Sequence, residues 1–231
     1  MDARAQSNRR SLWSRQWRRR VCGLLAGFIM MSMHSVAANA AATDFATTID
    51  DLERQWARIS YQLPVDQQRP KFEALSQQAA LVAKQFPDRA EALAWQAMIL
   101  CSHAESIGGL NALNLVTRAH DLLLRAAAID ERAMGGTIDG YLGTLYYKVP
   151  GWPIGFGDER KAKTYFQKSL AIDPTGIDPN YLYGHYLLDH GNKQEARKYL
   201  LKALDAPKRP EHREYDAGRR IDIQADLAKT N

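Results

Sequence analysis

Cysteine is scarce in this sequence, with only two among 231 residues. Cys22 lies in an N-terminal apolar run, which leaves Cys101 as the single cysteine after residue 40, and one cysteine cannot form an internal disulfide. A disulfide-stabilised scaffold is therefore excluded. The roughly 190 residues that remain are enough to build a core by packing alone. Cys101 ends the apolar run 97–101, which predicts a buried, unreactive thiol.

An excess of positive charge is absent from most of the chain, although the formal net charge is +5. Seven arginines and one aspartate lie in residues 1–40, so the other 24 basic and 25 acidic residues give residues 41–231 a net charge of −1. A strong basic excess is the electrostatic signature of proteins that bind nucleic acid. Its absence after residue 40 argues against a nucleic-acid partner.

Long apolar runs are lacking as well. The run near the N-terminus holds about 13 residues, fewer than the ~20 that a membrane-spanning helix needs. A basic stretch precedes it and Ala38-x-Ala40 follows, the pattern of a secretory signal peptide with its cleavage site. We therefore expect residues 1–40 to be removed near Ala40 and the mature protein to be periplasmic or secreted, without stable membrane insertion. An uncleaved anchor is the alternative, and Arg9-Arg10 leaves open whether export follows the general or the twin-arginine route.

Strand patterns are nearly absent, since no alternating run of β-branched residues exceeds a few positions. Helical periodicity extends instead from Asp44 to Lys229. Its clearest stretch is 180–207, where a break at 189–192 separates two helices and the second stops at Pro207. The chain is therefore predicted to be all-α.

This helical pattern repeats after 34 residues. One period relates Ala196 to Ala162, Leu200 to Phe166, Leu204 to Leu170 and Gly191 to Gly157. Two helices pack closely only where a small residue of one faces a large residue of the other. We therefore expect Gly184 and Ala196 at helix contacts, with Leu200 filling the gap between repeats.

These residues resemble the tetratricopeptide repeat superfamily, and Leu142-Gly143-x-x-Tyr146 is similar to the Leu-Gly-x-x-Tyr core of its first helices. The resemblance implies a right-handed α-solenoid of about four helix pairs over residues 41–208, followed by a capping helix and tail over residues 209–231. In its export signal and long inter-helix insertions, the chain is also similar to the T-component-like periplasmic proteins linked to TRAP transporters.

The repeat period is irregular upstream of residue 162. Equivalent positions of the second helices are spaced 44, 43 and 34 residues apart: Leu75, Ala119, Ala162 and Ala196. Two repeats therefore carry insertions, and the later insertion contains Val149–Phe156. A heptad bundle is the alternative arrangement for the early helices.

Motifs of catalysis and metal binding are missing. The chain lacks Gly-x-Ser-x-Gly and His-Glu-x-x-His, and Gly155-Phe156-Gly157 lacks the strand and the Gly-Lys-Ser/Thr of a phosphate loop. His185 and His190 lie five residues apart, about 140° around a helix, whereas a zinc pair occupies one face. We therefore expect no enzymatic activity, no cofactor and no metal site.

The resemblance also implies a binding groove, because first helices line the concave face of such solenoids. Tyrosine and histidine on that face have rigid apolar rings with polar tips, which is typical of recognition surfaces. The alternative is that this stripe packs between repeats and that the insert aromatics fold back onto adjacent helices. The predicted groove residues are Thr144, Tyr147, Lys148, Tyr181 and His185, with Trp152 and Phe156 at the rim and Glu91, Met98 and Cys101 upstream.

Two further expectations concern charged residues. Asp178, Tyr181 and His185 stand where the superfamily's carboxylate clamp has basic or amide groups, so this groove is not expected to capture an acidic C-terminal peptide. In the capping helix, an apolar stripe is expected to pack inward and a basic cluster to be solvated. The stripe is Ala217, Ile221, Ala225 and Ala228, and the cluster is Lys208, Arg209, Arg213, Arg219 and Arg220.

Taken together, these features predict an exported, non-enzymatic repeat protein that holds a protein or peptide partner in a concave groove. Its oligomeric state and the identity of its partner stay open. The rival function is an accessory small-ligand or solute-binding component of a periplasmic transport system. A closed apolar pocket would favour the solute, and an open, wet groove would favour the peptide.

Overall fold

The computed structural model describes residues 44–231, and the predicted signal peptide over residues 1–40 lies outside them. The chain divides into two units, residues 1–47 and 48–231. The helical repeats belong to the second unit.

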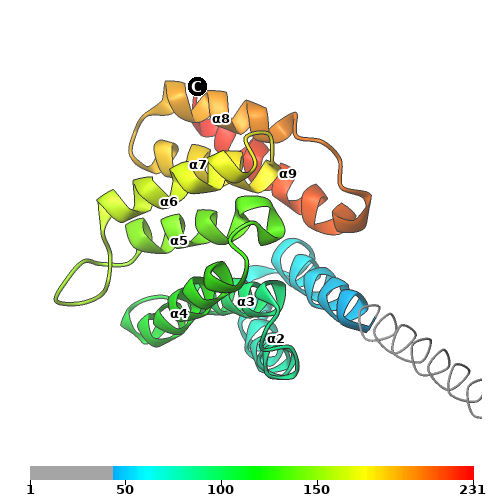
Figure 1. Cartoon of the computed structure of the whole chain (residues 1–231). Coiled ribbons are helices and arrows are strands. Elements are labelled where there is room, and N and C mark those ends of the chain that lie inside the picture. The colour runs from blue at the N-terminus through cyan, green and yellow to red at the C-terminus, as the bar shows by residue number, and fades with distance from the viewer. Residues whose placement is uncertain (1–43) are drawn as a thin grey trace, which may run out of the picture. The chain divides into compact units, whose positions relative to one another are not determined.

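Helices account for most of this unit, and the described residues contain no strand (Figure 1). The first helix of the unit ends at residue 62, and short 3-10 turns precede α4, α5 and α9. The other helices are α2 (Val65–Gln85), α3 (Ala90–Ile107), α4 (Leu113–Ile129), α5 (Thr137–Lys148), α6 (Glu159–Ile172), α7 (Ile177–Asp189), α8 (Lys193–Leu204) and α9 (Arg213–Lys229).

Three helix pairs stack on one another, namely α3 with α4, α5 with α6, and α7 with α8. Helix α4 also contacts α5, and α5 contacts α7, so each pair covers the apolar face that its neighbour leaves bare. This arrangement is an all-α solenoid, as predicted. The surface that α3, α5 and α7 share, away from their partner helices, is called the inner face.

Small residues set the spacing of the helix pairs. A Cβ added to Gly143 would lie 2.9 Å from the Phe166 ring, and one added to Gly184 would lie 3.0 Å from Leu200 Cγ. Phe166, Leu200 and Ala196 are each 0% exposed. Full burial of a Phe or Leu side chain stabilises a fold by roughly 1.5–3 kcal/mol. The two glycines let the neighbouring helix come close enough for Phe166 and Leu200 to be fully buried. The predicted 34-residue register is therefore confirmed at these positions.

Helix α9 packs on α7 and α8, as a capping helix does. The prediction of its buried face is wrong, because Ala217, Ile221, Ala225 and Ala228 are all exposed. The opposite face is buried instead, since it meets a polar, tyrosine-rich surface rather than an apolar one. The buried residues are Tyr215, Asp216, Gly218, Arg219, Ile223 and Asp226.

Candidate functional site

The predicted groove residues Tyr181 and His185 lie beneath α9. The Arg219 guanidinium lies over the Tyr181 ring, 4.6 Å from its centroid. His185 Nδ1 lies 2.6 Å from the Asp226 carboxylate. Burial opposes ionisation of Asp226, but hydrogen bonds with His185 and Lys229 outweigh it and hold the Asp226 pKa below its usual value. The inner face at α7 is therefore occupied by the chain's own C-terminal helix.

A buried ion pair joins α9 to the start of α7. Arg219 Nε donates to Asp178 Oδ1 at 3.0 Å, and the two side chains are 6% and 2% exposed. Tyr215 donates to the same oxygen at 2.7 Å, while Arg219 also donates to the Tyr141 hydroxyl on α5 at 3.3 Å. Burial would raise the Asp178 pKa, but Arg219 and Arg209 outweigh it, so that pKa is lowered and the carboxylate is ionised.

The prediction that this basic cluster is solvated is thus wrong for Arg219 and for Arg209. Arg209 Nη2 donates to Asp178 Oδ2 at 3.2 Å and forms a second ion pair with Asp216. Sequence periodicity could not reveal this pairing, because Asp178 is 41 residues from Arg219. One signal was available, however: Tyr215, Arg219 and Asp222 recur at helical spacing and mark a polar face on α9.

Helix α9 also reaches the first helix of the unit. Tyr61 donates to Asp222 Oδ2 at 2.7 Å, and the Trp56 and Tyr215 ring centroids lie 5.3 Å apart. Gly218 is required here, because a Cβ at this position would lie 2.0 Å from the Tyr61 ring. Helix α9 therefore contacts the first helix, α5 and α7 together, and it covers the inner face between them.

A second contact to the first helix lies just before α9. His212 Nδ1 is 2.7 Å from Glu53 Oε2, and this hydrogen bond raises the His212 pKa. Histidine–carboxylate pairs thus flank the polar face of α9, one at His212 and one at His185.

The remaining stripe residues meet at the ends of α5 and α7. Tyr147 donates to Asp189 Oδ2 at 3.2 Å, and Lys148 forms an ion pair with the same carboxylate. His185 Nε2 lies 3.7 Å from that oxygen. Thr144 instead donates to its own helix, to the Gly140 carbonyl at 3.0 Å. Asp189 is the residue that sequence reasoning missed, and it joins three of the predicted side chains.

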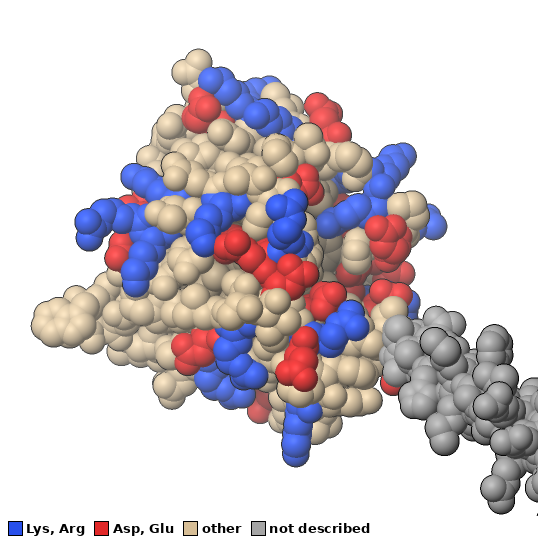
Figure 2. All heavy atoms as spheres, in the orientation of Figure 1, with Lys and Arg blue, Asp and Glu red and all other residues tan. Residues whose placement is uncertain are grey.

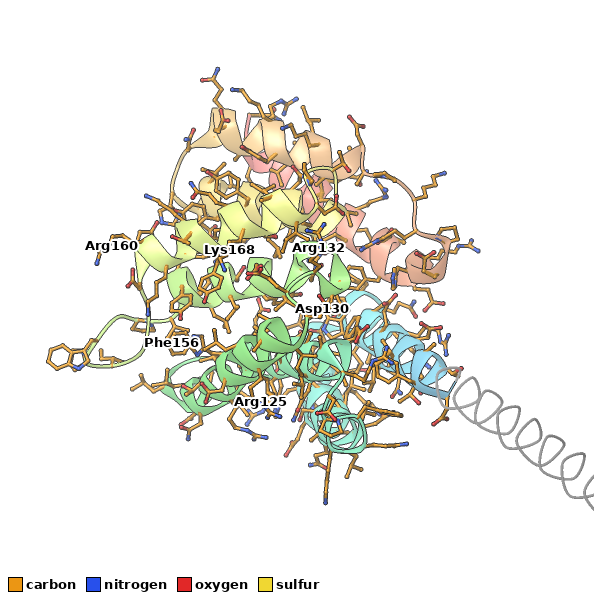
Figure 3. All side chains as sticks on the ribbon, viewed as in Figure 1. Arg125, Asp130, Arg132, Phe156, Arg160 and Lys168 are labelled. Atoms are coloured by element: carbon orange, nitrogen blue, oxygen red, sulfur yellow. The ribbon has the colours of Figure 1, made fainter. Side chains whose placement is uncertain are left out.

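The two insert aromatics have different environments. Phe156 packs inward, with its ring centroid 4.3 Å from that of His120 on α4 (Figure 3). Trp152 is 91% exposed. Figure 1 shows the loop between α5 and α6 projecting away from the helices. Its ends are joined by hydrogen bonds from the Gly157 amide to the Pro150 carbonyl and from the Asp158 amide to the Tyr146 carbonyl, at 3.0 and 2.9 Å.

Cys101 is the free cysteine of the described residues. Burial raises the pKa of the Cys101 thiol to about 12, so the thiol is protonated and a poor nucleophile at neutral pH. Across the described residues, no three His, Cys, Asp or Glu side chains gather as metal ligands would. Within residues 44–231, none of the helices combines the length and hydropathy of a membrane span.

The pair α7–α8 is the most regular of the three, with a short turn and with Gly184 facing Leu200. Residues 177–209 match the tetratricopeptide repeat family. None of the curated proteins matches the chain. Solved structures that are similar to it include a crystal structure of MamA and one of MamA protein. They share 21% and 19% identity, cover 59% and 71% of this chain and 88% and 92% of their own chains, and each has a TM-score of 0.30.

The matched tetratricopeptide repeat ends just before the segment that leads into α9. Arg209, its last residue, belongs to the ion-pair network that fixes α9. The first residues of the repeat include Asp178, on which the network is centred. Residues near both ends of the matched repeat therefore bind α9, the helix that covers the inner face.

Proposed function

We propose that this protein is an exported, non-catalytic scaffold that binds a protein partner through the loop over residues 149–158. The observation that carries the proposal is Trp152, a large apolar side chain that is 91% exposed on a loop with a fixed base. Tryptophan is among the residues that most often dominate the energy of protein interfaces. A loop tied at its base loses little conformational entropy on binding. Ile154, which is 56% exposed, enlarges the apolar tip.

The position of α9 favours this loop, rather than the inner face, as the site that binds the partner. A partner at Tyr181 or His185 would have to displace α9 and break the buried ion pair between Asp178 and Arg219. Breaking a buried ion pair in this way costs several kcal/mol. The loop carries no such cost, because Trp152 has no helix packed over it. The inner-face residues are therefore assigned to holding α9.

Replacing Trp152 with alanine is expected to weaken partner binding by about 30-fold, the ~2 kcal/mol of a hot-spot residue, without changing the melting temperature. A photo-crosslinking residue at position 152, introduced in the cells that make the protein, would identify the partner. Calorimetry with the purified partner would then compare Trp152→Ala with Leu81→Ala. Leu81 is the matched control because its apolar side chain is 69% exposed on α2. Equal affinities of the two variants would refute the loop as the binding site.

Export is a separate part of the proposal and has its own test. N-terminal sequencing of the protein recovered from outside the cytoplasm should begin near Ala41, because Ala38-x-Ala40 provides the small residues that signal peptidase requires. Recovery of an intact N-terminus in the membrane fraction would show that residues 1–40 are an anchor instead.

A further inference from the structure

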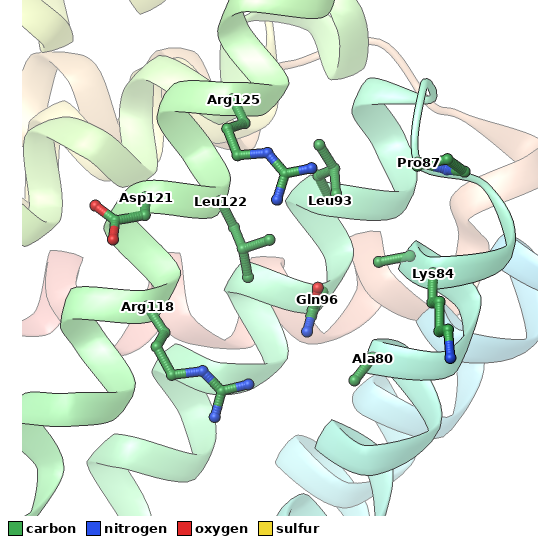
Figure 4. Close-up of a pocket in the computed structure, with 10 residues that line it drawn as sticks. Ala80, Lys84, Pro87, Leu93, Gln96, Arg118, Asp121, Leu122 and Arg125 are labelled. Atoms are coloured by element: carbon green, nitrogen blue, oxygen red, sulfur yellow. The ribbon is translucent and has the colours of Figure 1, made fainter.

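A hollow of about 420 Å³ lies between α2 and α4, over α3 and away from α9 (Figure 4). Apolar side chains that include Leu93 and Leu122 line part of it. Basic side chains come from both walls, Lys84 from α2 and the pair Arg118 and Arg125 from α4. The hollow is open and charged, unlike the enclosed apolar chambers that hold small solutes.

The three basic side chains of the hollow have no acidic partner. Neither Lys84 nor Arg118 nor Arg125 forms an ion pair or hydrogen bond with any residue in the described part of the chain. Some exposed lysines elsewhere are paired, such as Lys168, whose Nζ lies 2.8 Å from Glu131, and Lys198, whose Nζ lies 2.7 Å from Glu195. Figure 2 shows this mixing of basic and acidic side chains over one face of the molecule.

Asp121 is the acidic residue that lines the hollow, and it forms no ion pair with these cations. Its carboxylate is 71% exposed and lies 3.5 Å from His120 Nδ1. The hollow therefore keeps an excess of positive charge on a chain whose residues 41–231 carry a net charge of −1.

Gln96 supplies an independent indication of a ligand. Its side chain lines the hollow from α3, between the two basic walls (Figure 4). The residue is 7% exposed, and its carboxamide makes no hydrogen bond within the described residues, so both its donor and its acceptor are open to the hollow. A carboxamide donates and accepts, which matches the hydrogen-bonding capacity of a peptide group.

We propose that this hollow binds an extended acidic peptide segment of the scaffold's partner. Arg118 and Arg125 are seven residues apart on α4, a rise of about 10 Å. Carboxylates three residues apart on a peptide in the extended polyproline II conformation lie on one side of it, separated by about 9 Å. The arginines and Lys84 bind the carboxylates, and Gln96 pairs with the peptide backbone. The inference rests on the proposed scaffold function and adds a second contact, distinct from the Trp152 loop.

Other anionic occupants fit the hollow less well. A flat lipid surface cannot contact Gln96, which lies on the floor of a depression. A free carboxylate or phosphate would engage the basic walls but would not require a paired donor and acceptor on Gln96. An acidic peptide would use both the basic walls and the carboxamide of Gln96. The experiment below distinguishes binding of such a peptide from binding of a small anion.

The test measures fluorescence anisotropy with a short labelled peptide that carries glutamate at every third position. We expect the peptide to bind the wild-type protein and its glutamine counterpart not to bind. The double variant Arg118→Glu/Arg125→Glu should weaken binding at least about tenfold, because it removes two charge-assisted hydrogen bonds. The control is Arg160→Glu/Lys163→Glu, which makes the same charge change at exposed positions of α6 and should leave binding unchanged. A third variant, Gln96→Leu, should also weaken binding of the peptide.

Each outcome decides the proposal. An equal loss of peptide affinity in both double variants would show a general charge effect and would refute the hollow as the binding site. Competition by free glutamate or inorganic phosphate as strong as that by the peptide, with no effect of Gln96→Leu, would assign the hollow to a small anion. Concentration-dependent self-association that Arg118→Glu/Arg125→Glu abolishes would assign it to a second copy of the chain. Crosslinking from position 152 is independent of this hollow, so its failure would refute the scaffold proposal separately.

Discussion

Replacing Arg219 with methionine is expected to lower the free energy of unfolding by about 3–5 kcal/mol, the cost of leaving a buried charge without its partner. Asp178 is 2% exposed and receives hydrogen bonds from Arg219 and Tyr215. Methionine approximates the length of the arginine stem, so the loss is mainly electrostatic. Arg209 would still contact Asp178, but its side chain is 31% exposed and its charge is shared with Asp216. Chemical denaturation of both proteins gives the difference.

Arg213→Met is the matched control, because Arg213 lies on the same helix and is exposed. It should change stability by no more than about 0.5 kcal/mol. A second variant, Arg219→Met with Asp178→Asn, should recover part of the loss, since it removes the buried charge that Arg209 alone compensates only in part. If the single variant is as stable as the control, α9 is not held by this ion pair.

Replacing Asp139 with asparagine is expected to stabilise the protein above pH 6. The Asp139 side chain is 0% exposed on α5, and neither carboxylate oxygen has a hydrogen-bond partner among the described residues. Burial, reinforced by the charge of Glu131 and opposed by that of Lys168, raises the Asp139 pKa from 3.8 to about 6. The folded protein must therefore ionise a buried group when the pH passes 6.

The sign of the pH dependence follows from this shift. Below pH 3.8 the carboxyl is protonated in both the folded and the unfolded chain, so Asp139 imposes no ionisation cost. As the pH rises, the unfolded chain ionises first, and stability falls until the folded protein also ionises above about pH 6. A shift of this size corresponds to about 3 kcal/mol. Asparagine does not titrate, so the gain should appear above pH 6 and diminish at pH 4.

Thermal melts of Asp139→Asn across this pH range would measure the effect. Asp88→Asn serves as the control, because Asp88 is exposed and its loss of charge should change stability little at any pH. Parallel stability–pH curves for wild type and Asp139→Asn would contradict the assignment of the shift to this carboxyl.

The repeat register could be predicted from sequence because it depends on local size. Gly184 and Ala196 are small where a neighbouring helix must approach, and that requirement is visible in a spacing of 34 residues. The start of α6 is equally local, because the Asp158 side chain caps it by accepting hydrogen bonds from two backbone amides.

The position of α9 could not be predicted in the same way. An apolar stripe normally marks a buried face, and here that stripe, which includes Ile221, is exposed. The buried face is polar, and its stability depends on Asp178, Tyr141 and Tyr61, which are distant in sequence. Composition alone also could not separate Trp152 from Phe156. The two aromatics share one loop, and only the position of His120 on α4 determines which of them packs inward.

The contact between α9 and the first helix has a consequence for how the array unfolds. In an open repeat array each unit touches only its neighbours, so the ends fray independently and stability is nearly a sum over repeats. Here the hydrogen bond from Tyr61 to Asp222 joins segments 161 residues apart. Loss of the last helix therefore removes contacts from the first one. Fraying at either end is coupled to the other, which favours a single cooperative transition over stepwise melting.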